Sequence, residues 1–383
     1  MKLLPLFFLL ISCTSRSQDG IPFNGRTIGK LPFLEYGTGE DRLGGAKMTF
    51  LDTNIFVKVI DSFKTHYKVQ LSKYHQAYLD KSAFVRTNEI LRPEYLTADW
   101  KVFGDSAFDY VTIKLDEKLP YRSIQQIEPS RIVVDIFGAT SNSNWITQLS
   151  SCQEIKNAWL EQPEDDVMRV YIDLKHPQHW GHTIYYNGNI LNIRVRHQPL
   201  QPILQKLTIA VDAGHGGDNK GADGGISHVL EKAYTLLIAK ELKHQLQDKH
   251  AHVIMTREKD TALSMIERIQ ILKDSMPDLL ISIHLNSSSR DSVNGVSTYY
   301  RYIGFRPLST AILKRMRDLG LNEYGNVGNF NFGLNGPTDY PNCLVEVGFL
   351  SNRSDEKRIL NSAFHKEVAK KIIEGIEDFL RNL

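Results

Sequence analysis

From residue 206 to the C-terminus, short apolar runs alternate with longer stretches of helical periodicity. The predicted strands are KLTIAVDAG, AHVIMTR, DLLISIHLNS, GVSTYYR and NCLVEVGFLSN. The predicted helices are EKAYTLLIAKELKHQLQ, ALSMIERIQILKDS, PLSTAILKRMRDLG and FHKEVAKKIIEGIEDFLRNL. Such alternation is typical of an α/β domain with a mainly parallel sheet that is covered by helices on both faces.

The chain before residue 206 has a different pattern. Residues 26–95 contain short alternating runs such as NIFVKVID and YKVQLS, which predict a small β-barrel. Residues 98–198 contain DYVTIKL, SRIVVDIFGA, DVMRVYIDL and ILNIRVR, which predict a β-sandwich. The stretch RHQPLQPILQ (196–205) is polar and carries two prolines, so residues 199–205 are predicted to be a linker. We therefore expect two small all-β domains, followed by an α/β domain at 206–383.

The composition is that of an ordinary globular protein. The 383 residues are 42% hydrophobic and 23% charged, with a formal net charge of +2. A chain with so little net charge and no basic tract is not expected to bind nucleic acid.

The N-terminus, MKLLPLFFLLISC, has one lysine and then an apolar run too short to span a bilayer. Residues 1–12 are predicted to be a signal peptide, and residues 13–25 a tether. Leu10-Ile11-Ser12-Cys13 resembles the bacterial lipobox, which implies a lipid on Cys13 and a membrane anchor. The expected location is then the cell envelope or periplasm, anchored by lipid in the outer membrane. The alternative is an ordinary secretory signal in which Cys13 is incidental.

Two further cysteines, Cys152 and Cys343, are too few for a disulfide framework. We expect them to lie in different domains, with Cys343 as a small buried apolar residue.

Four side chains stand out in the α/β part, because ligands gather at the carboxyl ends of strands in such sheets. His215 follows the first strand in VDAGHGG, Glu231 opens the first helix, His284 lies near the end of LLISIH, and Glu346 lies in the last strand. Two imidazoles and a carboxylate suit a hydrolytic zinc site, and a further carboxylate can take a proton from water.

Each of the four has a simpler interpretation. His215 could be a turn residue, His284 a buried core side chain, and Glu231 an acid at the positive end of a helix dipole. Glu346 is the hardest to explain in this way, because a carboxylate between Val345 and Val347 is costly to bury unless it is paired or functional.

Other chemistries lack their motifs. A phosphate-binding loop is excluded, because no Lys-Ser or Lys-Thr follows at the required spacing and Asn219 occupies the third glycine position. The oxygen ligands of a calcium loop are incomplete in DNKGADGG, and no Gly-x-Ser-x-Gly elbow is present.

The motifs VDAGHGG, EKAYTLLIAKEL, VIMTREKD, ISIHLNS and LVEVGFLSN resemble, in order and spacing, those of the zinc-dependent N-acetylmuramoyl-L-alanine amidases of the amidase_3 type. The resemblance covers residues 206–383. It implies one Zn²⁺ held by His215, Glu231 and His284, with Glu346 as the catalytic residue. The same resemblance makes Asn286, Arg257 and Asp260 supporting residues. Asp212 is expected to hold the metal-binding loop in shape.

The chain departs from this family's usual pattern in two places. It has SIHLN where SIHAN is usual, and NFNFGLNGPTDYP departs from the more usual arginine-bearing version, so the details of substrate contact are not carried over from the resemblance. No long insertion separates SIHLNS from the last strand, so an autoinhibitory helix at that position is not expected.

In the preceding half, RIVVDIFGA, RVYIDL and LNIRV resemble the AMIN domain, which implies targeting to the envelope. Residues 26–95 loosely resemble the Src-homology-3-like modules found beside bacterial cell-wall enzymes.

These observations lead to a functional hypothesis. The chain is expected to hydrolyse the amide bond between N-acetylmuramic acid and L-alanine in peptidoglycan, in wall remodelling or daughter-cell separation. Its expected partners are peptidoglycan, the membrane through Cys13, and an activator protein of the envelope. Two alternatives stay open: a non-catalytic lipoprotein that binds peptidoglycan, and a zinc peptidase that cuts within the stem peptide.

Overall fold

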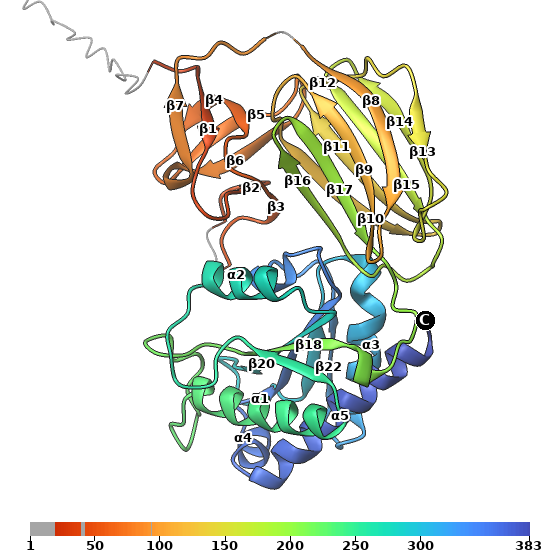
Figure 1. The fold of residues 1–383 in the computed structure, drawn as a ribbon. Coiled ribbons are helices and arrows are strands. Elements are labelled where there is room, and N and C mark those ends of the chain that lie inside the picture. Colours follow the sequence, from red (N-terminus) through yellow and green to blue (C-terminus); the bar gives the residue numbers. More distant parts are fainter. Residues whose placement is uncertain (1–19, 40–42, 93) are drawn as a thin grey trace, which may run out of the picture.

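The computed structural model describes residues 20–39, 43–92 and 94–383. Two β-rich parts lie side by side, and an α/β part packs below both of them (Figure 1). The predicted signal peptide and Cys13 lie outside the described residues. The first strand, β1, covers Phe23–Thr27 and therefore includes the end of the stretch expected to be a tether.

The first β-rich part is one antiparallel sheet with the strand order β3-β2-β6-β5-β4-β1-β7. Alternate residues of its strands are buried, among them Leu34, Val59, Val69 and Leu79. The strands are β1, β2 (Phe33–Glu35), β3 (Lys47–Phe50), β4 (Phe56–Ser62), β5 (His66–Gln70), β6 (Gln76–Asp80) and β7 (Phe84–Thr87). A 3-10 turn at Lys81–Ala83 separates β6 from β7. We call this part the N-terminal barrel.

The second β-rich part consists of two sheets with the strand orders β10-β11-β15-β14 and β12-β8-β9-β17-β16; β13 also pairs with β8. Ile132 and Val134 of one sheet and Val111 and Ile113 of the other are fully buried, and they belong to an apolar cluster that continues into the N-terminal barrel. The strands are β8 (Tyr95–Gly104), β9 (Phe108–Leu115), β10 (Tyr121–Ile127), β11 (Ser130–Phe137), β12 (Ala139–Thr140), β13 (Ile146–Gln148), β14 (Ile155–Glu164), β15 (Val167–Leu174), β16 (His182–Asn187) and β17 (Ile190–Arg196).

The α/β part has a six-stranded sheet with the order β19-β18-β20-β23-β21-β22. All neighbouring pairs are parallel except β21 with β23. The strands are β18 (Thr208–Ala213), β19 (His252–Met255), β20 (Leu279–Asn286), β21 (Val296–Tyr299), β22 (Glu323–Val327) and β23 (Asn342–Phe349). The helices are α1 (Glu231–Asp248), α2 (Met265–Ser275), α3 (Arg306–Arg317), α4 (Arg353–Ile359) and α5 (Ser362–Arg381).

Helices cover both faces of this sheet. Helices α1, α3 and α5 bury apolar side chains on one face, together with Ile209, Val211 and Ile281 of the strands. Helix α2 packs on the other face, where Ile269 and Leu272 contact the apolar cluster. The predicted fold class, an α/β domain with a mainly parallel sheet preceded by two all-β parts, is confirmed.

Alternation along the strands decides which side chains can meet. Ile209, Val211, Ile281, Ile283 and Val345 face α1 and α5, and so the residues between them face the opposite way. The polar residues Asp212, Ser282, His284 and Glu346 therefore all lie on the face covered by α2, near the carboxyl ends of β18, β20 and β23.

The two cysteines of the described residues are free and buried, Cys152 just before β14 and Cys343 in β23. They lie beside or in strands of different sheets. Among the described residues, no helix combines the length and the apolar character that crossing a membrane requires.

Candidate metal centre and active site

The loop after β18 brings His215 toward the sheet. Gly214 lies so close to His284 that a Cβ atom there would come within 2.5 Å of the imidazole ring. His215 has a φ of 60°, and Gly216, with a φ of 131°, has a conformation that side chains disfavour. Asn219 Oδ1 lies 2.8 Å from His215 Nδ1, so the imidazole presents Nε2 to the interior. The glycines thus allow both the sharp turn and the close approach.

Glu231 is the first residue of α1, and its carboxylate lies between the two histidines. His215 Nε2 is 3.0 Å from Glu231 Oε1, and His284 Nδ1 is 3.1 Å from the same oxygen. The other oxygen of Glu231 accepts from the backbone N–H of Ala222 at 2.7 Å. One ligand atom from each of the three residues can be chosen so that all lie within 4.8 Å of one another. The structure therefore brings these three side chains together.

The environment of Glu231 keeps it ionised. Burial would raise the pKa of its carboxyl group, but the hydrogen bonds and the charges of His215 and His284 outweigh burial and hold this pKa well below its usual range. An ionised carboxylate beside two imidazole nitrogens is a donor set suited to a divalent cation.

Glu346 lies next to this group on the sheet. In the parallel pair β20–β23, Glu346 is directly opposite His284, and on its other side it is opposite Ser297 of β21. Tyr299 is two residues beyond Ser297, and its hydroxyl is within 3.2 Å of Ser297 Oγ and 3.4 Å of Asn286 Nδ2. Burial and the negative charge of Glu346 both raise the pKa of Tyr299. The phenol therefore stays protonated beside the carboxylate.

Asp212 is fully buried beneath the loop and accepts three hydrogen bonds. They come from Thr256 Oγ1 and Ser282 Oγ, both at 2.6 Å, and from the guanidinium of Arg268. Burial would raise the pKa of Asp212, but the charges of Arg268 and His284, together with the hydrogen bonds from Ser282 and Thr256, outweigh burial and lower this pKa. Arg268 also donates to the carbonyls of Ala213 and His215. The buried Asp212–Arg268 ion pair is thus hydrogen-bonded, through Arg268, to the backbone of the loop that carries His215.

Arg257, Asp260 and Asn286 occupy different places around this core. Arg257 is buried and donates to the carbonyls of Ala213 and Gly214, so it too holds the end of β18. Asp260 accepts from the backbone N–H of Gly217 and from Lys232 Nζ. Asn286 follows His284 on the same face of β20, and its side chain contacts Tyr299 instead of the three-residue group.

Arg268 is the site residue that the sequence reading missed. It is a cation on the buried side of α2, next to Ile269, in a helix whose other buried residues are apolar. That position is itself a signal, because a buried arginine requires an acid and Asp212 is a buried acid in an apolar strand.

Two family models match parts of this chain. A family model described as N-acetylmuramoyl-L-alanine amidase matches residues 209–378, and a model of the AMIN domain matches residues 102–195. The chain carries an amidase domain and an AMIN domain. The amidase domain contains the three-residue group and Glu346, and the AMIN domain coincides with the β-sandwich.

The amidase domain is also similar to individual proteins. Probable cell wall amidase LytH of Staphylococcus saprophyticus is 32% identical over 49% of this chain and 64% of its own length. The protein of the same name from Staphylococcus epidermidis is 34% identical over 46% of this chain and 59% of its own. The chain thus spans about three fifths of these relatives. The catalytic domain of the amidase CwlV from Bacillus (Paenibacillus) polymyxa var. colistinus is 30% identical. The match covers 46% of this chain and 98% of that domain, with a TM-score of 0.44.

Proposed function

We propose that this chain is a metal-dependent hydrolase that cleaves the amide bond between N-acetylmuramic acid and L-alanine in peptidoglycan. The observation that carries the proposal is the meeting of His215, Glu231 and His284 around one point, with Glu346 opposite His284 on the adjacent strand. The match of the surrounding residues to an N-acetylmuramoyl-L-alanine amidase family supports the choice of bond.

Zinc is the proposed metal, one ion per amidase domain. Glu231 Oε1 lies 3.0 and 3.1 Å from the two imidazole nitrogens, and the three residues offer ligand atoms that all lie within 4.8 Å of one another, so one ion could be held between them. Two histidines and one carboxylate are also a common catalytic zinc set, which leaves one position for water or substrate. When bound, the ion would polarise the substrate carbonyl and make water a stronger acid.

The remaining chemistry falls to the protein's own groups. We assign Glu346 the role of general base, which takes a proton from the attacking water and passes it to the leaving amine of L-alanine. Glu346 is partly exposed while the other residues of β23 are buried, so the strand fixes the position of this side chain. Asp212, Arg257 and Arg268 hold the His215 loop, which keeps the imidazole in place during the reaction.

The cellular setting is part of the proposal. An AMIN domain and relatives named as cell wall amidases support an exported protein of the cell envelope that acts on peptidoglycan. A lipid anchor at Cys13, placement in the outer membrane and control by an envelope activator protein remain predictions from the sequence. The division into a barrel at 26–95, a sandwich at 98–198, a linker at 199–205 and a catalytic domain at 206–383 is proposed on the same basis.

Digestion of purified sacculi tests the function. The full chain is incubated with sacculi, with and without a chelator, and the soluble products are identified by mass spectrometry. We expect intact stem peptides that begin with L-alanine, and no release once the metal is removed. A shortened stem still attached to the sugar would instead indicate a peptidase, and binding to sacculi without any release would indicate a non-catalytic protein.

A pair of variants tests the role of Glu346. Glu346→Gln keeps the shape of the side chain but cannot accept the proton, so turnover should fall by at least about 100-fold while the metal stays bound. Glu367→Gln, at an exposed position of α5, is the matched control and should act like the unmodified protein. Full turnover by Glu346→Gln would contradict the mechanism.

A further inference from the structure

The N-terminal barrel contacts the amidase domain at the loop beside the metal centre. Asn331 Nδ2 donates to the carbonyls of Gly45 at 2.7 Å and Leu43 at 3.4 Å, and Asn331 Oδ1 accepts from the backbone N–H of Lys47 at 3.0 Å. Both ends of this carboxamide are thus bonded to the backbone of the barrel. A second contact runs from Arg301 to the carbonyl of Lys47.

The residues on either side of Asn331 reach the active site. The ring of Phe332 meets that of His284 edge-on, with the centroids 5.3 Å apart, and the ring of Phe330 lies 4.5 Å from that of Tyr299. The two phenylalanine rings are also stacked, with their centroids 6.3 Å apart. The segment therefore joins the two parts of the molecule: Asn331 bonds to the barrel, while its neighbours contact a candidate metal ligand and the tyrosine beside Glu346.

The backbone of this segment is irregular, although Phe330 N–H donates to the carbonyl of Tyr300 at 3.1 Å and the carbonyl of Phe332 accepts from Asn335 N–H at 3.1 Å. Residues 328–332 form no helix or strand, glycines at 328 and 333 border the aromatic residues, and Asn329 has a φ of 54°. Fixing each residue of such a loop costs about 1–2 kcal/mol of backbone entropy, so the hydrogen bonds of Asn331 to the barrel add to the contacts that order it.

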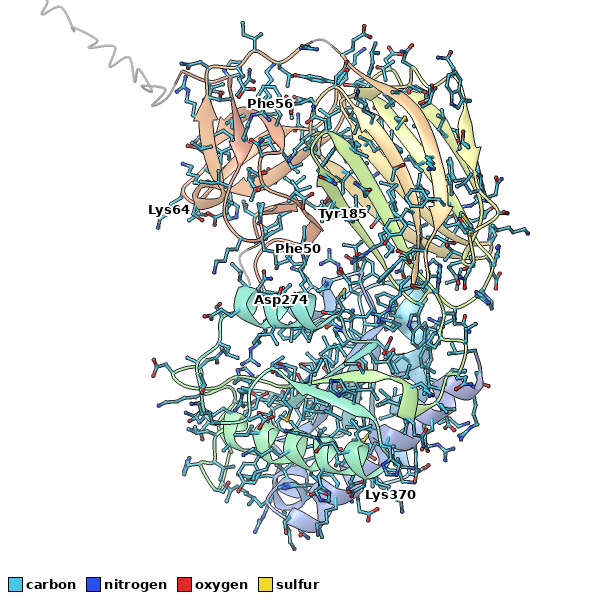
Figure 2. All side chains as sticks on the ribbon, in the orientation of Figure 1. Phe50, Phe56, Lys64, Tyr185, Asp274 and Lys370 are labelled. Carbon is cyan, nitrogen blue, oxygen red and sulfur yellow. The ribbon has the colours of Figure 1, made fainter. Side chains whose placement is uncertain are left out.

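The N-terminal barrel can hold this segment in place, because it packs against the amidase domain nearby. Leu31 belongs to the apolar cluster of Ile269, Leu272 and Leu334 in the amidase domain. Phe50 lies at the edge of the barrel that faces α2 (Figure 2), and a Cβ on Gly336 would come within 2.7 Å of its ring. A cavity of about 380 Å³ remains between the two parts, bordered by Lys47, Asn331 and Phe332.

We propose that Asn331 is a positioning residue and that, through it, the N-terminal barrel forms part of the substrate site. The barrel holds Phe330 and Phe332 against Tyr299 and His284, and these rings form a wall beside the reacting amide. The inference depends on the proposed function. It makes the barrel necessary for substrate binding in this chain, in addition to any role in the envelope.

The test uses the full chain with Asn331→Ala and Asn331→Asp. The aspartate keeps the size and the acceptor toward Lys47, but it places an oxygen where the carbonyls of Leu43 and Gly45 need a donor. We expect both variants to raise KM for a soluble disaccharide-peptide roughly tenfold, as the loss of about 1.4 kcal/mol predicts. The kcat should stay within about twofold, and the zinc content should not change.

Hydrogen–deuterium exchange gives a second readout that needs no turnover. Exchange of the amides of residues 328–333 should become faster in both variants. Asn189→Ala is the matched control: its side chain makes a similar long-range bond, to the carbonyl of Asp116, and both residues belong to the β-sandwich. It should leave both KM and the exchange at 328–333 unchanged.

The outcomes separate the two proposals. A KM within twofold of the unmodified protein in both Asn331 variants would overturn the role in substrate binding, even if exchange is faster. Unchanged exchange would overturn the positioning itself. If the unmodified chain releases no stem peptide, the proposed function fails on its own, and the exchange measurement still decides whether Asn331 orders the loop.

Discussion

Replacing Arg268 by methionine tests whether the buried ion pair under the His215 loop supports the metal centre. Methionine is apolar and of similar length, so it fills the space on α2 without a charge. Asp212, only 1% exposed, would keep its bonds from Thr256 and Ser282 but lose its counter-charge. The carbonyls of Ala213 and His215 would also lose a donor.

The expected loss in the free energy of unfolding follows from the burial of the Asp212–Arg268 pair. Removing one partner of a buried ion pair typically costs about 3–5 kcal/mol, because the other charge is left without compensation. In Asp212→Asn/Arg268→Met both charges are gone, so the double variant should be destabilised by less than the sum of the single variants, with a coupling of at least about 2 kcal/mol. Loss of the bond to the His215 carbonyl should also weaken metal binding by about 10–100-fold.

Urea unfolding followed by circular dichroism measures the free energy of unfolding, and competition with a chromophoric chelator measures zinc affinity. Lys273→Met is the matched control, because it removes a cation from an exposed position of the same helix and should change stability by less than about 0.5 kcal/mol. The reasoning is refuted if Arg268→Met unfolds within about 1 kcal/mol of the unmodified protein and binds zinc equally well.

Three further predictions concern other parts of the structure. Gly214→Ala should lower zinc affinity at least tenfold by chelator competition, since its Cβ would come within 2.5 Å of the His284 ring, whereas Gly37→Ala, with open space around it, should not. Burial lowers the pKa of His182 to about 3, so its contribution to stability is complete above the unfolded pKa of about 6.5 and is lost as the pH falls. Unfolding free energies at pH 7 and 5 should differ by about 2 kcal/mol from this residue alone, a difference that His182→Asn removes. Cys343 is buried and its pKa is raised by burial, so a thiol reagent should label it only after unfolding, as mass spectrometry can show.

The residues of the proposed metal site and the proposed general base could be singled out in the sequence because each is tied to a local signal. His215 follows a strand in a glycine-rich loop, Glu231 begins a helix, and His284 and Glu346 interrupt apolar strands. The two-residue period of a strand then places His284 and Glu346 on one face. What the pattern leaves open is the order of strands, which puts β20 next to β23 and so His284 opposite Glu346.

Contacts between residues far apart in the sequence are harder to predict from the sequence. Arg268 meets Asp212 only because α2 crosses the sheet face under the loop, and no local pattern fixes that crossing. The contact of Asn331 with residues 43–47 joins positions nearly 300 residues apart, in a stretch that the sequence marks only as a departure from the usual family pattern. Strands with exposed polar residues, such as β14 and β22, were also missed, because their alternation is weak.

Two separate supports therefore converge on one centre, and they should fail in different ways. Arg268 holds the backbone that carries the proposed metal ligand His215, whereas Asn331 is proposed to hold the rings that border the substrate. A protein with both Arg268→Met and Asn331→Ala should accordingly show the weaker zinc binding of the first variant and the higher KM of the second, measured at saturating zinc, with neither effect enlarged by the other. If the Asn331 change alone weakens zinc binding as much as the Arg268 change does, the rings act on the metal centre itself, and the division between ligand support and substrate wall is wrong.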